Sequence, residues 1–137
     1  LELSRDEKNS KIKAFENPLT QSQLNKARAA VREVRMSEQV EEYLVQIILA
    51  TRNSDKYGGN LSDWLEFGAS PRATIALDIC SKSLAWLDNR NFVTPDDIRS
   101  IAHDVLRHRL ILSFEAEANG ISSDQVVDEL LKVVPSA

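Results

Sequence analysis

Apolar residues recur three or four positions apart along several stretches of this chain, the spacing of helices that turn one face toward a core. The most regular stretch follows Ser37, a residue type suited to cap a helix. Its apolar positions form one stripe: Val40, Tyr43, Leu44, Ile47, Ile48 and Thr51. A longer stretch from Pro71 to about Leu87 is apolar on nearly every side. We therefore expect this helix, including Ile79, at the buried centre of the domain.

Residues typical of helix starts precede the remaining apolar stretches. Thr20 with Gln23 resembles a capping box. Thr94 before Pro95 combines an N-cap with a proline at the first helical position. The last helix is expected to start near Ser122 or Ser123.

Short segments connect these helices. Residues 53–60 carry two adjacent glycines and indicate a loop, and residues 61–67 form at most a short helical turn. Residues 110–112 suggest either a short strand or an extended exit from the preceding helix. These elements predict an all-α fold: a small helical bundle of four to six helices with at most one very short strand pair. We expect this domain over residues 20–137, after a linker or frayed lead-in over residues 1–19.

The composition is that of one soluble globular domain, with 137 residues, 42% hydrophobic and 28% charged. A net charge of −4 argues against a nucleic-acid partner. No apolar stretch approaches the roughly 20 residues of a membrane span. The single cysteine, Cys80, lies in an apolar pattern, so we expect a buried inert thiol and a reducing compartment such as the cytoplasm. The chain begins at Leu1 without methionine, which favours an excised piece of a longer protein.

The segment from Gly68 to Ala73 carries the candidate chemistry. Gly68 allows a sharp entry, Ser70 can cap the helix by accepting a backbone N–H, and Pro71 suits the first helical position. Arg72 then lies in the first turn, where free N–H groups and the helix dipole favour an anion. A guanidinium there can bind two phosphate oxygens at once. The alternative is an exposed arginine in a surface salt bridge of little energetic value.

The same segment resembles the start of the sensor-2 helix in the MoxR family of AAA+ ATPases. Further strings agree in order and spacing with the small helical lid of that family: Ala50-Thr51-Arg52, Val93-Thr94-Pro95-Asp96-Asp97-Ile98 and Val105-Leu106-Arg107-His108-Arg109. The likeness covers roughly residues 18–135. Each string alone is weakly specific, whereas all of them in the right order are strongly so. One departure is Asn89-Arg90, where members commonly carry Gly-Arg. Asparagine tolerates the left-handed conformation of such a turn, and Arg90 is a candidate to brace it.

The resemblance implies a nucleotide-sensing lid of a larger ATPase. Arg72, with Ser70 and Pro71, would contact the nucleotide phosphate, and the intact parent would bind ATP and Mg. The implied partners are the AAA+ core domain of the same chain, neighbouring subunits in a ring, and in some cases a von Willebrand factor A-type protein. The parent would couple ATP hydrolysis to chaperone-like remodelling or maturation of protein complexes, sometimes with metal insertion.

We expect no catalysis from this chain alone. The phosphate-binding pattern G-x-x-x-x-G-K-[ST] does not occur, and no strand ends in paired acids. Asp96 and Asp97 are best explained as first-turn acids that oppose the helix dipole. The two histidines, His103 and His108, predict no metal site, because they are five positions apart and point to different faces of a helix.

Several basic residues keep open roles. Arg99, His103 and Arg107 share one helical face, which is either solvated or a contact to a partner or neighbouring subunit. Arg52, at a helix end, is either structural or near the nucleotide. The whole domain has an alternative as well, a stand-alone helical protein-interaction module. A Walker A segment encoded directly upstream of Leu1 would favour the lid.

Overall fold

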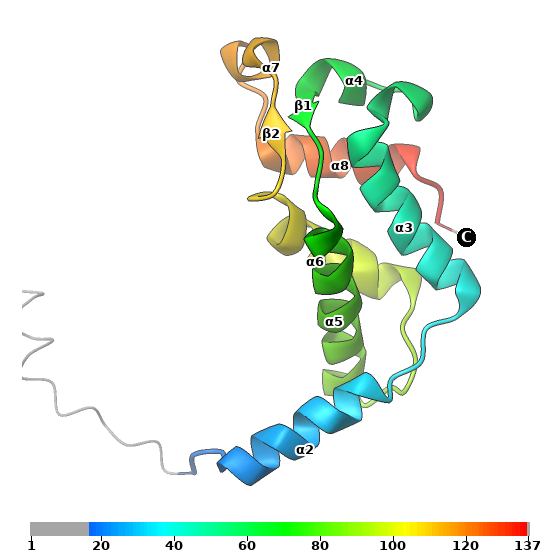
Figure 1. Cartoon of the computed structure of the whole chain (residues 1–137), viewed down its shortest axis with the longest axis vertical. Helices are drawn as coiled ribbons and strands as arrows, with labels where there is room; N and C mark the ends of the chain where they lie inside the picture. Colours follow the sequence, from blue (N-terminus) through cyan, green and yellow to red (C-terminus); the bar gives the residue numbers. More distant parts are fainter. Residues whose placement is uncertain (1–16, 137) are drawn as a thin grey trace, which may run out of the picture.

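The computed structural model describes residues 17–136. Most of the predicted lead-in, up to residue 16, lies outside the described residues. The elements in chain order are α2 (Gln21–Arg32), α3 (Glu38–Arg52), the 3-10 helix η1 (Ser54–Lys56), α4 (Leu61–Trp64), β1 (Leu65–Phe67), α5 (Pro71–Leu87), α6 (Pro95–Leu106), β2 (Ile111–Leu112), α7 (Phe114–Ala118) and α8 (Ser123–Val133) (Figure 1). The predicted helical bundle with one very short strand pair is confirmed.

Side-chain caps begin three of these helices, and the sequence predicts those at Thr20 and Ser37 as caps. The Thr20 Oγ1 accepts the Gln23 N–H at 3.1 Å, and the Gln23 side chain accepts the Thr20 N–H at 2.8 Å. The same reciprocal pair forms between Ser122 and Gln125 at the start of α8. Ser37 caps α3 by accepting the Val40 N–H at 3.4 Å. These local bonds satisfy N–H groups that no helical carbonyl can reach, which is why the helices begin there.

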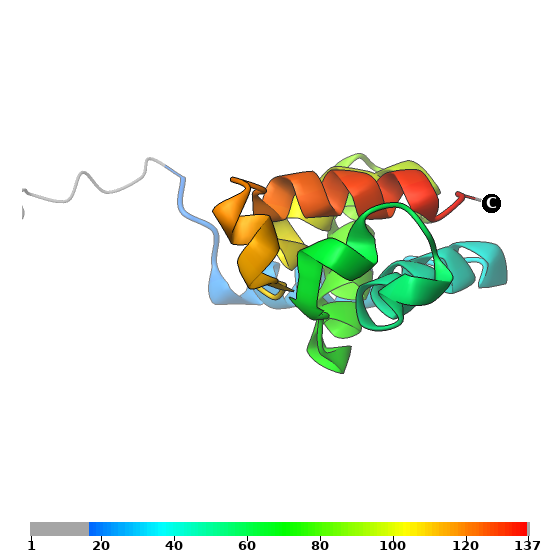
Figure 2. The ribbon, with the colours of Figure 1, turned by 90° about the horizontal axis from the view of Figure 1, so that it is seen from above.

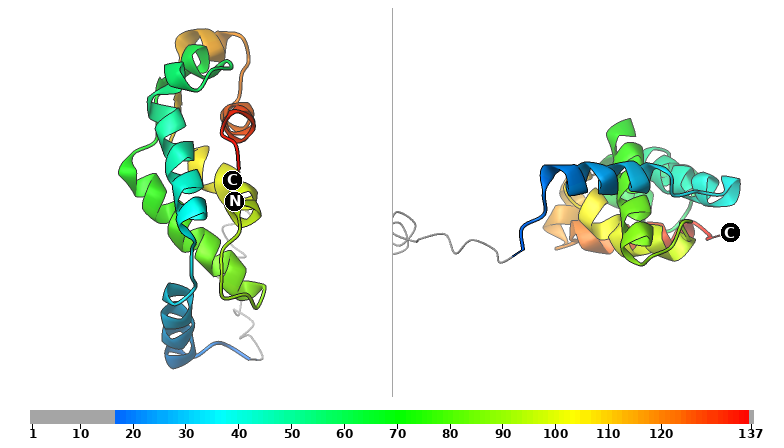
Figure 3. Two further views of the ribbon diagram at one scale, coloured as in Figure 1. Left: turned by 90° about the vertical axis from the view of Figure 1, so that its right-hand side faces the viewer. Right: turned by 90° about the horizontal axis from the view of Figure 1, so that it is seen from below.

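β1 and β2 form a two-stranded antiparallel sheet in which Leu65 lies opposite Leu112 and Phe67 opposite Ile111. The sequence leaves residues 110–112 open between a short strand and an extended exit, and it assigns the residues of β1 to a helical turn. This pairing connects segments far apart in the chain, so no local pattern announces it. Figures 1 and 3 place the strand pair and α7 at one end of the domain and α2 at the other.

The core lies where α3, α5, α6 and α8 meet. Its largest fully buried apolar side chains are Ile47, Leu61, Leu77, Ile98, Leu106 and Leu130. Seen from above, α8 runs along one side of the domain and α3 lies on the other side (Figure 2). Among the described helices, none is both long and apolar enough to cross a membrane.

The expectation that α5 is buried on nearly every side is wrong. Its buried residues are Ala73, Leu77, Ser81 and Ala85, a single stripe four positions apart. The small members of this stripe allow α6 to pack closely. By contrast Ile75 is 60% exposed, Ile79 is 53% exposed and Cys80 is also exposed, so the thiol is not the buried one predicted. A helix that is apolar on every side is fully buried only if neighbouring elements surround it. The described elements bury one side of α5.

Candidate functional site

The loop that leads into α5 lies directly against the end of α3. A Cβ on Gly68 would come within 2.1 Å of the backbone oxygen of Thr51. The next residue, Ala69, donates its N–H to the Thr51 Oγ1 at 2.9 Å. Gly68 is therefore required for close backbone approach, and its φ is not in the left-handed region that a sharp glycine turn would use. This contact joins two of the strings noted in the sequence, Ala50-Thr51-Arg52 and Gly68–Ala73.

The start of α5 is less capped than the sequence predicts. Ser70 occupies the N-cap position with extended backbone, and Pro71 is the first helical residue, both as expected. The Ser70 hydroxyl, however, makes no capping hydrogen bond. The Ala73 N–H instead bonds to the Ser70 carbonyl at 2.8 Å. The predicted capping role of the Ser70 side chain is wrong, and its hydroxyl stays available to another group.

Arg72 is exposed in the first turn of α5, and it makes no ion pair or side-chain hydrogen bond with any described residue. The surface salt bridge that was the alternative to phosphate binding by Arg72 does not form within residues 17–136. Arg72 is thus not buried at the centre of the domain, where the sequence analysis places this helix. Its backbone is nevertheless held on both flanks, because Ala69 is 1% exposed and Ala73 fully buried. Arg52, at the end of α3, is exposed as well.

The face of α5 that carries Arg72 continues as an apolar stripe. Ile75 and Ile79 follow at three and seven positions, the spacing of one helical face, and both are more than half exposed. The stripe ends in an open groove of about 530 Å³ between α2 and α5. The apolar lining of this α2–α5 groove is Leu24, Ala27, Val31, Ile79, Trp86 and Leu87. An arginine and an apolar track thus share one side of the helix.

The basic face of α6 is used inside the domain. Arg99 donates through Nη1 to the Leu131 carbonyl at 3.1 Å and to the Tyr43 hydroxyl at 3.2 Å. His103 Nε2 lies 2.9 Å from Asp128 Oδ1, and Arg107 Nε lies 2.9 Å from Asp124 Oδ1. The acids stand four positions apart on α8 and match the basic spacing on α6. The face is therefore neither simply solvated nor a contact reserved for another subunit.

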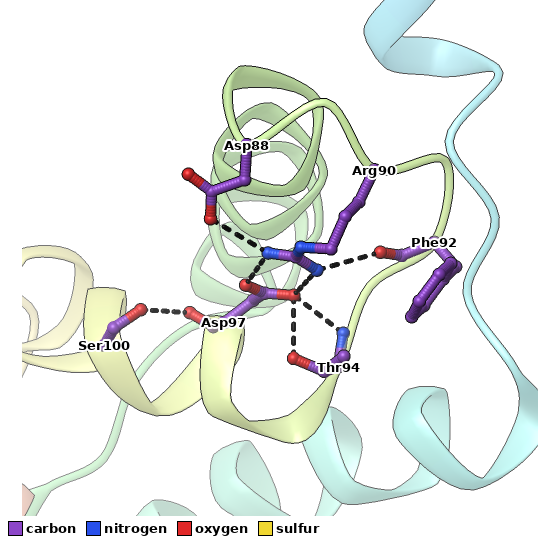
Figure 4. A network of polar contacts seen from close by, with 6 residues as sticks. All are labelled: Asp88, Arg90, Phe92, Thr94, Asp97 and Ser100. Carbon is purple, nitrogen blue, oxygen red and sulfur yellow. Dashed lines mark hydrogen bonds and ion pairs between the residues drawn. The ribbon is translucent and has the colours of Figure 1, made fainter.

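Arg90 braces the turn between α5 and α6, as the sequence suggested (Figure 4). Its guanidinium binds Asp97 with two hydrogen bonds, at 2.8 Å and 2.6 Å, and reaches Asp88 at 3.1 Å. Asn89 has φ 58°, the left-handed conformation expected there. Asp97 is more than a first-turn acid, because its carboxylate is 5% exposed and also accepts the Thr94 N–H at 2.7 Å.

The charges of this pair are mutually stabilised. Burial by itself would raise the pKa of Asp97, but the hydrogen bonds from Arg90 and Thr94 outweigh it, and the pKa lies below its ordinary value. The hydrogen bonds with Asp97 and then Asp88 raise the pKa of Arg90. Arg90 is thus committed to the fold and is not available for a ligand.

Within residues 17–136 no group of three or more His, Cys, Asp or Glu residues is arranged to hold a metal ion. The candidate site is the Arg72 guanidinium at the start of α5, and contacts to the end of α3 hold the loop that precedes it.

Comparison with known proteins identifies the family. Residues 62–130 match the AAA lid domain family. Chaperone MoxR1 of Mycobacterium tuberculosis is 39% identical over 94 residues, which are 68% of this chain and 25% of that protein. The uncharacterized protein YeaC of Bacillus subtilis is 32% identical over 132 residues, 96% of this chain and 39% of that protein.

A solved structure agrees over nearly the whole chain. The crystal structure of a provisionally assigned ATPase from Cytophaga hutchinsonii superposes with a TM-score of 0.84 at 32% identity, covering 99% of this chain and 42% of that one. The chain thus spans well under half the length of these relatives. With the lid fold and the Gly68–Ala73 segment both in place, the chain belongs to the AAA lid domain family, in the branch of the MoxR-type AAA+ ATPases.

Proposed function

We propose that this lid reports whether the ATPase core of its parent protein holds a nucleotide with its terminal phosphate, and that Arg72 is the reporting group. One observation carries the proposal: the Arg72 guanidinium has no partner among the described residues, while Ala69 and Ala73 fix its backbone. A cation placed in this way is available to an anion that arrives from outside the domain.

The described residues suit the phosphate of the implied ATP–Mg ligand but not its metal ion. A phosphate suits Arg72, since a guanidinium binds two oxygens at once and the positive end of α5 lies beside it. Ser70 offers its uncommitted hydroxyl at the same place, next to Pro71. A Mg ion does not fit, because the described residues contain no acidic cluster to bind it. The metal ligands and the phosphate cradle would come from the core domain.

The core domain is the partner that we propose for the apolar side of α5. Ile75 and Ile79 lie on the face that carries Arg72, and their exposure is unusual for isoleucine. A core that covers this stripe would bury apolar area while it presents its nucleotide to Arg72. The greater length of the relatives supports the existence of such a further part.

The proposed activity of the whole protein is inferred from its family alone. We propose that the parent hydrolyses ATP in a ring of subunits and remodels or matures protein complexes in the cytoplasm. One relative is named a chaperone, which supports this direction. A von Willebrand factor A-type partner is a further proposal that follows only from the resemblance.

Replacing Arg72 by alanine in the full-length protein tests the reporting role. The loss of a charge-assisted contact to phosphate should lower ATP turnover by about 10- to 100-fold without changing the melting temperature. Lys132→Ala is the control, because Lys132 is an exposed cation on α8 with a weak 3.5 Å contact to Glu129. Turnover that Arg72→Ala leaves unchanged would contradict the proposal.

The alternative is a helical interaction module without any nucleotide role. The open α2–α5 groove favours it, since an apolar groove is a common docking site for a partner helix. The Arg72→Ala experiment separates the two functions, because a simple interaction module has no turnover for Arg72 to affect.

A further inference from the structure

We propose that Thr51 is a positioning residue that fixes the start of α5 to the end of α3, so that a force on Arg72 moves both helices together. The structural part of this inference stands on contacts within the domain. Its link to nucleotide rests on the proposed function of Arg72.

The hydroxyl of Thr51 makes two hydrogen bonds, one as donor and one as acceptor. It donates to the Ile48 carbonyl at 2.7 Å and accepts the Ala69 N–H at 2.9 Å. Thr51 is 2% exposed and Ala69 is 1% exposed, so water is a poor substitute for either partner. A buried N–H that loses its acceptor is costly, and the bond therefore holds the loop toward α3.

Gly68 permits this close approach. The backbone oxygen of Thr51 occupies the space that a Cβ on Gly68 would need, so a larger residue would push the loop away from α3. The hydrogen bond from Ala69 to Thr51 therefore depends on glycine at the preceding position. Loops without such contacts absorb displacement by themselves.

The anchored loop determines how a displacement at Arg72 would reach α3. Arg72 lies three residues after Ala69 and one before the buried Ala73. When an anion draws the guanidinium, the short anchored segment cannot stretch, and the displacement passes to α3 through Thr51. Arg52, the residue that follows Thr51, moves with it.

The first test measures the ratio of ATP to ADP affinity in the full-length protein. Thr51→Val keeps the shape of the side chain and removes the hydroxyl, and it should lower the preference for ATP by about tenfold. Thr51→Ser should restore the preference. Ser81→Ala is the matched control, because Ser81 is also a fully buried hydroxyl but bonds only within its own helix, to the Asp78 carbonyl at 3.1 Å.

Arg72→Ala in the same assay separates the two proposals. If Arg72→Ala leaves the ATP preference unchanged, the reporting function is wrong. If Arg72→Ala lowers the preference and Thr51→Val does not, the positioning role of Thr51 is wrong. If Ser81→Ala lowers the ratio of ATP to ADP affinity as much as Thr51→Val does, the positioning role is also wrong, since a general loss of stability would then explain the effect.

A second measurement needs no nucleotide and begins with the wild-type chain. Hydrogen exchange of the wild-type chain should show the Ala69 amide protected to the level of the α3 helix, although it lies in a loop. Exchange of this amide at the rate of an exposed loop would overturn the proposal. Gly68→Ala should raise that rate by tenfold or more, because its Cβ displaces the loop from Thr51.

Discussion

At the residue scale, the polar groups of this lid divide into those committed to the fold and those left open. Arg90 and Asp97 form a two-bond pair that joins the α5–α6 turn to the first turn of α6. Arg72 has an equal charge and no described partner. A single basic residue therefore says little about function until its neighbours are known. The sequence identified both arginines, but it could not show that Asp97 is the group that holds Arg90.

The Arg90–Asp97 pair should make the lid sensitive to acid. The pKa of Asp97 is lower in the folded chain than in the unfolded chain, so the folded state gains stability at neutral pH. This gain should begin to disappear below about pH 5 and be lost once the pH falls below the folded pKa. Melting curves from pH 7 to pH 3 check this. Wild type should lose more stability than Asp97→Asn over that range, and parallel losses would contradict the assignment.

At the element scale, local signals located the helix starts and failed where tertiary contact decides the outcome. Capping patterns at Thr20 and Ser37 predict the observed bonds because they are complete within four residues. β1 and α7 escaped notice, since a short strand or helix is set by what packs against it. The burial of α5 was overestimated for a related reason: composition does not say how many neighbours a helix has. The candidate site was identified as a motif, whereas its contact with Thr51 was not predicted.

Two aspartate substitutions on α5 distinguish the observed single buried stripe from the predicted burial on nearly every side. Leu77 is fully buried, so Leu77→Asp should prevent cooperative folding. Ile79 is 53% exposed, and Ile79→Asp should fold with a loss of roughly 1 kcal/mol or less. Circular dichroism melts of the two variants provide the comparison. An unfolded Ile79→Asp chain would restore the sequence-based expectation and contradict the observed packing.

At the scale of the whole molecule, the domain has one side packed and one side open. α3 and α6 pack against α5, whereas the side with Arg72, Ile75 and Ile79 faces out. α2 contains no buried residue although it is amphipathic. A helix of 12 residues gains little stability by itself. These open surfaces agree with a domain that works against a further part of its parent.

The central claim is that Arg72 recognises the terminal phosphate of a nucleotide held by that further part. The most direct measurement is the affinity of the full-length protein for ATP and for ADP, in wild type and in Arg72→Ala. The account predicts that Arg72→Ala weakens ATP binding by about tenfold or more and leaves ADP binding nearly unchanged. An equal effect on both nucleotides, or none on either, would contradict it.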